Sequence, residues 1–356
     1  MVKKITGTLF VLAMTATAFA QDSTKAVTFS GSVDAYYRYN NGKDPSGNNF
    51  KNSYTSFTKT ANSFELGMAS LRADATALSG KVTATVDLGY GSRATEFSYN
   101  DGPALTAIKQ AYITYSPASF VKFTAGKFAT HVGYELLDAP LNRNYSMSYM
   151  FTNGPFFHTG LKADFTLGKL GLMVGVANHV DQTTSMEKVK DVIAQVSSTS
   201  MDKLKIYLNY WGYFGDNTET TGAKSKSQLD LVVLGTITDK FNIGYNGTVQ
   251  SWKNVDGTSK ETITNTWWGS ALYLNYDPSS AIGLTLRGEY IGDKNAFYYN
   301  TKNVFETTLS LNYKVGPFTL IPEVRYDSAK DDYFYKNDGT MTKSTFSAIL
   351  AAMYKF

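Results

Sequence analysis

The chain ends on the stretch Ser344-Thr345-Phe346-Ser347-Ala348-Ile349-Leu350-Ala351-Ala352-Met353-Tyr354-Lys355-Phe356. A β-strand alternates its side chains between two faces, so every second residue from Phe346 to Phe356 projects to the same side. That side is wholly apolar and carries an aromatic residue near each end, as a lipid-facing strand between two interfacial aromatic girdles requires. The alternative is an ordinary sheet strand that happens to close a domain.

The other end of the chain has the pattern of a cleaved export signal. Lys3 and Lys4 form a basic start, residues 5–17 are nearly free of large polar groups, and Ala18-Phe19-Ala20 has the small-x-small pattern of a cleavage site. We therefore expect residues 1–20 to be a signal peptide and residues 21–356 to form the mature domain. The sequence has no Cys, which excludes disulfides, a lipid anchor on Cys and thiolate chemistry.

Composition narrows the class of protein further. After the signal, no run reaches the roughly 18 to 20 apolar residues that a spanning helix needs, so a membrane protein of this sequence must be a β-barrel. The chain has 25 Tyr and 22 Phe but a mean hydropathy of only -0.24. The formal net charge of +4 includes Lys3 and Lys4 of the signal. This charge predicts neither nucleic-acid binding nor a strong ion preference.

Strands that are apolar on one face and polar on the other recur from Val27 onward. They predict an all-β fold, an antiparallel up-and-down transmembrane barrel. The connections alternate between short turns and long polar loops, as expected for a periplasmic and an extracellular rim. Fifteen connections predict about sixteen strands, with a bulge near Ala69 and Ser70 where the apolar phase slips. The turns are 78–80, 116–119, 167–169, 200–203, 238–240, 277–280 and 314–317, and the loops are 40–62, 96–106, 133–156, 178–191, 215–227, 253–264, 292–303 and 328–343.

A barrel of this size encloses water, so the polar face should line a channel. Charges of both signs share the inward parity and are interleaved with Thr, Asn and Gln. Such confinement to one face is expected because Arg or Lys on the lipid face costs about 2 to 4 kcal/mol near the midplane. The inward charges are Asp34, Arg38, Glu65, Arg72, Asp74, Asp87, Arg93, Lys122, Lys162, Asp164, Asp230, Arg287, Glu289, Glu306, Glu323 and Arg325.

The loop 133–156 and the strand ends beside it hold the richest mixture of charged, aromatic and Gly residues. It contains Gly126-Lys127-Phe128-Ala129-Thr130-His131-Val132-Gly133-Tyr134-Glu135, Asn144-Tyr145-Ser146-Met147-Ser148-Tyr149-Met150-Phe151 and Pro155-Phe156-Phe157-His158-Thr159-Gly160. Here the sequence resembles the OmpL-like group of β-barrel porins, in which these segments recur in the same order. The match departs at Met147, where the family pattern has Arg, so no cation is assigned there.

The resemblance implies a passive channel in the bacterial outer membrane, with no cofactor, in which the third loop narrows the lumen. Its partners would be outer-membrane lipid, small hydrophilic solutes and the assembly machinery, with a homotrimer as one possible assembly and no role for nucleic acid. The terminal Phe356 resembles the residue that this machinery reads in outer-membrane barrels. Candidate constriction residues are Lys127, His131, Glu135, Asp138, Arg143, His158 and Lys162. The alternative is that aromatic residues pack the loop against the wall while its charges satisfy one another.

Three other functions are alternatives to a general diffusion channel. An inward line of aromatic residues, on which sugar rings would stack, is typical of a solute-specific channel such as a saccharide channel; it consists of Tyr36, Tyr112, Tyr207, Trp211, Tyr213, Trp267 and Tyr273. An enzyme is disfavoured, because the three His residues show no grouping with a nucleophile. Three His without paired spacing and no Cys also predict no transition-metal site. A structural barrel without an open lumen would need bulky inward side chains throughout, which the many inward Thr, Ser, Gly and Asn residues oppose.

Overall fold

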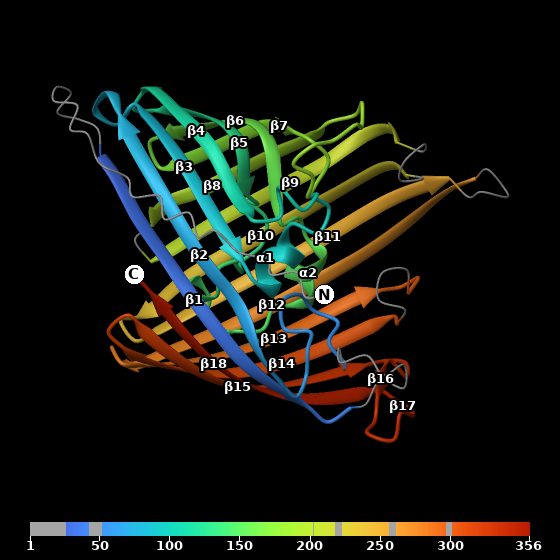
Figure 1. The fold of residues 1–356 in the computed structure, drawn as a ribbon. Helices are drawn as coiled ribbons and strands as arrows, with labels where there is room; N and C mark the ends of the chain where they lie inside the picture. Colours follow the sequence, from blue (N-terminus) through green and yellow to red (C-terminus); the bar gives the residue numbers. More distant parts are fainter. Residues whose placement is uncertain (1–25, 43–51, 202, 218–222, 256–260, 297–300) are drawn as a thin grey trace, which may run out of the picture.

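The computed structural model describes residues 26–42, 52–201, 203–217, 223–255, 261–296 and 301–356. Over these residues sixteen antiparallel strands close into one barrel, and each strand pairs with its neighbours in sequence (Figure 1). The last strand, β18 (Ser344–Lys355), closes the ring by pairing with β1 (Ala26–Asn40). The predicted fold and strand count are confirmed. Residues 1–25 lie outside the described part, so the signal peptide stays a prediction.

The remaining strands of the barrel follow one another around the wall. They are β2 (Ser63–Ala77), β3 (Val82–Tyr90), β4 (Ile108–Ala118), β5 (Val121–Ala129), β6 (Phe157–Leu167), β7 (Leu170–Ala177), β8 (Asp191–Met201), β9 (Leu204–Asn217), β10 (Ala223–Thr238), β11 (Phe241–Val255), β12 (Thr262–Ser279), β13 (Ile282–Asp293), β14 (Asn303–Val315) and β15 (Phe318–Ala329). Several strands run further into the predicted turns than expected, because a hairpin needs only a few residues to reverse the chain.

Short helical and extended segments lie within the connections. The short turn after β2 contains η1 (Leu78–Gly80), and the loop after β3 contains α1 (Ser92–Phe97). The loop after β5 contains η2 (Ala139–Leu141) and α2 (Tyr149–Asn153), and the last loop forms the two-stranded sheet of β16 (Phe334–Tyr335) and β17 (Met341–Thr342). Figure 1 shows α1 and α2 within the ring of strands, whereas β16 and β17 lie at its rim. Among the described residues, no helix is long and apolar enough to cross a membrane.

The alternation of exposure along each strand confirms the predicted faces. In β18, Phe346, Leu350 and Tyr354 are 40 to 51% exposed, whereas the inward Ser347 and Ala351 are at most 3% exposed. The outward apolar side chains stay exposed in the isolated barrel because they form the surface that faces lipid. The inward face therefore supplies the interior of the barrel.

The predicted bulge lies at Gly67, two residues before Ala69. Asp34 of β1 pairs with Met68 while its neighbour Ala35 pairs with Leu66, so Gly67 is the extra residue of β2. A Cβ at this position would collide with the carboxylate of Asp34 and would lie 2.6 Å from the hydroxyl of Tyr145. Glycine is therefore required where a loop residue approaches the wall closely.

Candidate functional site

The connection from β5 to β6, residues 130–156 and hereafter loop 3, crosses the inside of the barrel. Its backbone and side chains hydrogen-bond to inward side chains of nine strands, namely β4, β6 and, for most of the bonds, β1 and β10–β15. A loop at the centre of the barrel cannot pair its N–H and C=O groups with a strand, so wall side chains must satisfy them. The anchors below show how this is done.

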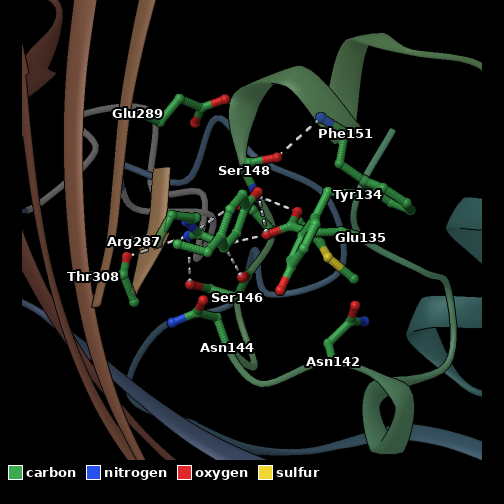
Figure 2. A network of polar contacts seen from close by, with 12 residues as sticks. Tyr134, Glu135, Asn142, Asn144, Ser146, Ser148, Phe151, Arg287, Glu289 and Thr308 are labelled. Carbon is green, nitrogen blue, oxygen red and sulfur yellow. Dashed lines mark hydrogen bonds and ion pairs between the residues drawn. The ribbon is translucent and has the colours of Figure 1, made fainter. Parts of the chain in front are cut away.

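Arg287 of β13 is the central anchor, and its side chain is fully buried. Its guanidinium donates to Oε1 of Glu135 at 2.6 Å and to the carbonyl of Ser146 at 2.7 Å (Figure 2). It also donates to Oε2 of Glu306 at 3.0 Å. Glu135 in turn accepts from the backbone N–H of Ser148 at 2.8 Å. Arg287 therefore joins two separate parts of loop 3, at Glu135 and at Ser146, to each other and to the barrel wall.

Two inward carboxylates hold the backbone of loop 3. Glu289 accepts from the N–H groups of Tyr149 at 2.7 Å and Met150 at 2.8 Å, at the beginning of α2. Glu323 accepts from the N–H groups of Tyr145 at 2.7 Å and Ser146 at 3.0 Å. The first N–H groups of a helix have no partner within it, and a carboxylate there also offsets the positive end of the helix dipole. The carboxylates of the wall thus accept the backbone hydrogen bonds that a neighbouring strand would otherwise accept.

Further anchors fix residues 138–145 of loop 3. Arg143 makes a two-pronged ion pair with Asp277 at 2.7 and 3.0 Å, and Asp138 pairs with Lys109 at 2.5 Å. The hydroxyl of Tyr145 donates to Asp34 at 2.6 Å, across Gly67. Guanidinium and carboxylate planes match in a pair such as Arg143 with Asp277, which restricts rotation of the loop as well as its position.

Apolar side chains of loop 3 fill the space on the long-loop side of these anchors. Met147, Phe151 and Phe156 pack with Phe57 and Phe97 in one buried cluster inside the barrel. The rings of Phe151 and Phe156 stack with centroids 5.4 Å apart. A sixteen-stranded barrel has room for an aqueous channel, and this cluster fills part of that cross-section with protein.

The predicted constriction residues fall into three groups. Glu135, Asp138 and Arg143 are anchors, whose charges are paired with wall residues. Lys127, His131 and His158 are covered: Lys127 pairs with Asp101 at 2.7 Å, His131 bonds to the carbonyl of Tyr210 at 3.0 Å, and His158 contacts Thr130 at 3.4 Å. Burial lowers the pKa of His131 to about 4, so it is neutral at neutral pH. Lys162 lines the largest of the cavities beside these residues, whereas Arg143 and Asp138 border two smaller cavities.

That cavity, of about 520 Å³, borders the wall formed by β2–β6. Three cations and the carboxylates of Asp74 and Asp164 meet there. Arg72 binds Asp74 at 2.7 Å, while Lys162 and Lys122 lie 3.3 and 3.8 Å from Asp164. Thr hydroxyls line the rest, with Tyr112 and Gln110. One net positive charge therefore remains on this part of the wall.

The aromatic line predicted along the lumen is mostly covered. Tyr36, Trp211, Tyr213, Trp267 and Tyr273 are at most 3% exposed, because loop 3 and its neighbours pack on them. Trp211 and Trp267 also donate their indole N–H groups to Gln228 and Gln250, which are bonded to each other at 2.9 Å. The five rings therefore form no continuous track for a solute.

The anchoring roles of Arg287, Glu289 and Glu323 were not predicted. The alternation of side chains predicts that all three face inward, but it does not predict which residues they contact. In the described part of the chain, no three His, Cys, Asp or Glu residues are grouped to hold a metal ion.

Known structures share this architecture. The outer membrane channel DcaP of Acinetobacter baumannii superimposes with a TM-score of 0.66 at 15% identity, covering 93% of this chain and 97% of that one. An anion-selective porin from Comamonas acidovorans gives a TM-score of 0.58 at 12% identity, covering 93% and 100%. These likenesses show the fold. A search of curated protein sequences gives no significant match.

A family model matches residues 26–356, nearly the whole described chain, and its description is "Putative beta-barrel porin-2, OmpL-like". The match includes loop 3 and the strands that anchor it. The protein is a channel of the bacterial outer membrane for passive diffusion of small solutes, and the chain belongs to the OmpL-like family of β-barrel porins.

Proposed function

We propose that loop 3 forms the constriction of this channel and that hydrophilic solutes pass between it and the wall formed by β2–β6. The observation that carries the proposal is the double carboxylate clamp, in which Glu289 and Glu323 hold four backbone N–H groups of loop 3 against the opposite wall. A loop anchored mainly on β10–β15 and β1, with Lys109 of β4 as a further anchor, leaves the cavity beside β2–β6 as the path. The seven predicted residues then divide into loop anchors, covered residues and one path-lining residue, Lys162.

Weak anion preference follows from the charges along this path. Glu135, Asp138 and Arg143 are paired with wall residues, so they add little to the field that a solute meets. Lys122, whose side chain is 50% exposed, and Lys162 share the single carboxylate of Asp164. Charged groups lining a narrow pore set its ion selectivity. An excess of one positive charge favours anions modestly.

A general diffusion channel fits this geometry better than a channel with an aromatic track. Five of the seven rings in the predicted line are covered, which leaves Tyr112 and Tyr207 accessible to solutes. We also propose a transport role without catalysis, because the three imidazoles are held by Tyr210, Thr130 and Asp191 in structural contacts.

Replacing both Lys122 and Lys162 with Gln should shift the reversal potential in a salt gradient toward cations. One unit charge acting over about 10 Å of water changes an ion's energy by about 0.4 kcal/mol, with opposite signs for cations and anions, so each substitution should change the permeability ratio about four-fold. The measurement is the reversal potential of purified protein in planar bilayers at low salt. Lys188→Gln, in the exposed loop after β7, makes the same charge change away from the path and should leave the potential unchanged. Equal potentials for the double variant and the parent protein would place the path elsewhere.

We further propose that three copies assemble into a trimer. The support is two pairs of small outward residues on strands near the seam of the barrel, Ala35 with Ala352 and Ala75 with Ala84. Small side chains allow two barrel walls to approach closely. Ala84→Trp should convert the native particle from three barrels to one in native mass spectrometry, whereas Val249→Trp on β11 should not. A single barrel in the parent protein would exclude the trimer.

Phe356 is proposed as the residue through which the assembly machinery recognises the chain. Its backbone pairs with Gly31 of β1 at 2.9 and 3.0 Å, yet its ring is 64% exposed at the rim. The ring is therefore accessible to a partner even in the closed barrel.

A further inference from the structure

A second cavity, of about 400 Å³, lies at the long-loop end of the barrel, on the other side of loop 3 from the anchors of Arg143 and Asp138. Residues of the loops after β1, β3, β5 and β7 line it, together with the ends of β9 and β10. Its volume is in the range of small-molecule sites in proteins. Solutes that enter from outside meet it before loop 3, and we call it the vestibule cavity.

Tyr99 gives the vestibule cavity an exposed but fixed aromatic ring. The residue is 58% exposed, while its hydroxyl donates to Oδ2 of Asp181 at 3.2 Å. The ring also meets Phe156 edge to face, with the planes at 87° and the centroids 6.1 Å apart. An aromatic side chain on a loop is ordinarily free to rotate when it is exposed. Here two contacts hold the ring in one orientation, so a ligand that stacks on it does not have to order it.

Asp181 holds Tyr99 because its carboxylate is fixed by the neighbouring backbone. Oδ1 of Asp181 accepts from the N–H groups of Phe156 at 2.6 Å and Phe157 at 3.0 Å. Burial raises the pKa of Asp181 to about 6, while the N–H groups of Phe157 and Phe156 and the Tyr99 hydroxyl oppose that shift. The carboxylate is therefore ionised at pH 7.5. The loops after β3 and β7 and the end of loop 3 meet at this one side chain.

The charges around the vestibule cavity balance. On one side Lys59 pairs with Glu96 at 2.5 Å, and Oε2 of Glu96 also accepts from the N–H of Phe57 at 2.8 Å. On the other side Lys226 lies over the ring of Trp211, with its ammonium 5.6 Å from the centroid. Two cations thus face two carboxylates, Glu96 and Asp181. This balance gives no net attraction for ionic solutes, yet it offers hydrogen-bond donors and acceptors on both sides of an aromatic ring.

We propose that the vestibule cavity is an entry subsite for neutral sugars, in which a pyranose ring stacks on Tyr99 and its hydroxyls bond to Lys59, Glu96 and Lys226. A pyranose carries an apolar face of C–H groups and a rim of hydroxyls, which matches an aromatic platform between charged side chains. The inference rests on the proposed function in that the sugar must then pass loop 3. The subsite retains sugars at the entrance and raises their local concentration there.

The test is sugar-dependent block of current by maltose in planar bilayers at pH 7.5. Maltose on the loop side should reduce the conductance of the parent protein, with half-maximal effect in the millimolar range. Tyr99→Ala should raise the half-blocking concentration at least ten-fold. Tyr99→Phe retains the ring and its contact with Phe156, so it should stay within three-fold of the parent protein. Glucuronate and glucosamine should each bind more weakly than glucose, because the cavity favours neither charge.

Several outcomes would overturn the proposal. They are absence of maltose-dependent block, block that persists unchanged in Tyr99→Ala, and charged sugars that block better than glucose. The conductance without sugar and the size limit in liposome swelling report on loop 3, and both are measured for every variant beside the block by maltose. Normal block together with an unchanged reversal potential in the Lys122 and Lys162 variant would therefore reject the path while retaining the subsite. The converse result would reject the subsite alone.

Discussion

Replacing Arg287 with Met should release loop 3 from the wall and produce a larger, less stable channel. The substitution leaves the buried carboxylates of Glu135 and Glu306 without the cation that they share, at 2.6 and 3.0 Å. Removing one partner of a buried ion pair costs about 3 to 5 kcal/mol. We expect a higher single-channel conductance, a higher size limit for sugars in liposome swelling, and a lower midpoint of thermal unfolding followed by circular dichroism.

Arg72→Met is the matched control for this substitution. Arg72 also faces the interior and also pairs with a carboxylate, but its side chain is 33% exposed and that of Asp74 is 38% exposed. Solvent screens such a pair, so its loss should cost at most about 1 kcal/mol. Adding Glu135→Gln and Glu306→Gln to Arg287→Met removes the unpaired charges and should restore part of the stability without restoring the position of the loop. If Arg287→Met matches Arg72→Met in conductance and unfolding midpoint, Arg287 is not the central anchor.

Deleting Phe356 should lower the amount of assembled barrel in the outer membrane several-fold and leave protease-sensitive chains in the periplasm. The purified variant should nevertheless fold in detergent, because the strand pairing of β18 with β1 and β15 does not depend on the exposed ring. The loss therefore concerns recognition during assembly rather than stability of the finished barrel. Heat-modifiable migration on gels measures the folded fraction in both settings.

Two substitutions separate recognition of the terminal ring from closure of the barrel. Phe356→Tyr keeps a terminal aromatic ring and should assemble nearly as well as the parent protein, whereas Phe356→Asp should behave like the deletion. The backbone contacts with Gly31 remain available in both substitutions. Normal assembly of the deletion and of Phe356→Asp would show that the terminal ring carries no signal.

The barrel was predictable because its determinants are local in sequence. The inward or outward direction of a side chain depends on its position in the strand, so the alternation from Phe346 to Phe356 predicts the lipid face without knowledge of any neighbour. The lengths of the connections likewise predict which strands are adjacent and how many there are. The phase slip in β2 was located to within a few residues, but Gly67 could be identified as the bulge only once Tyr145 was seen to reach Asp34 beside it.

The sequence by itself determined a sixteen-stranded barrel with a polar interior and an unusual third loop, and it indicated the family. Only the tertiary structure decided what the interior charges do. Glu135 was expected to line the constriction, but it is bound to Arg287, which lies 152 positions away in the sequence. Such pairings depend on how a long loop crosses the barrel, and the alternation of apolar and polar residues does not predict the course of a loop. The same folding covers Glu135 while Lys162 lines the cavity beside β2–β6, because loop 3 satisfies most of its backbone groups on the wall of β10–β15 and β1.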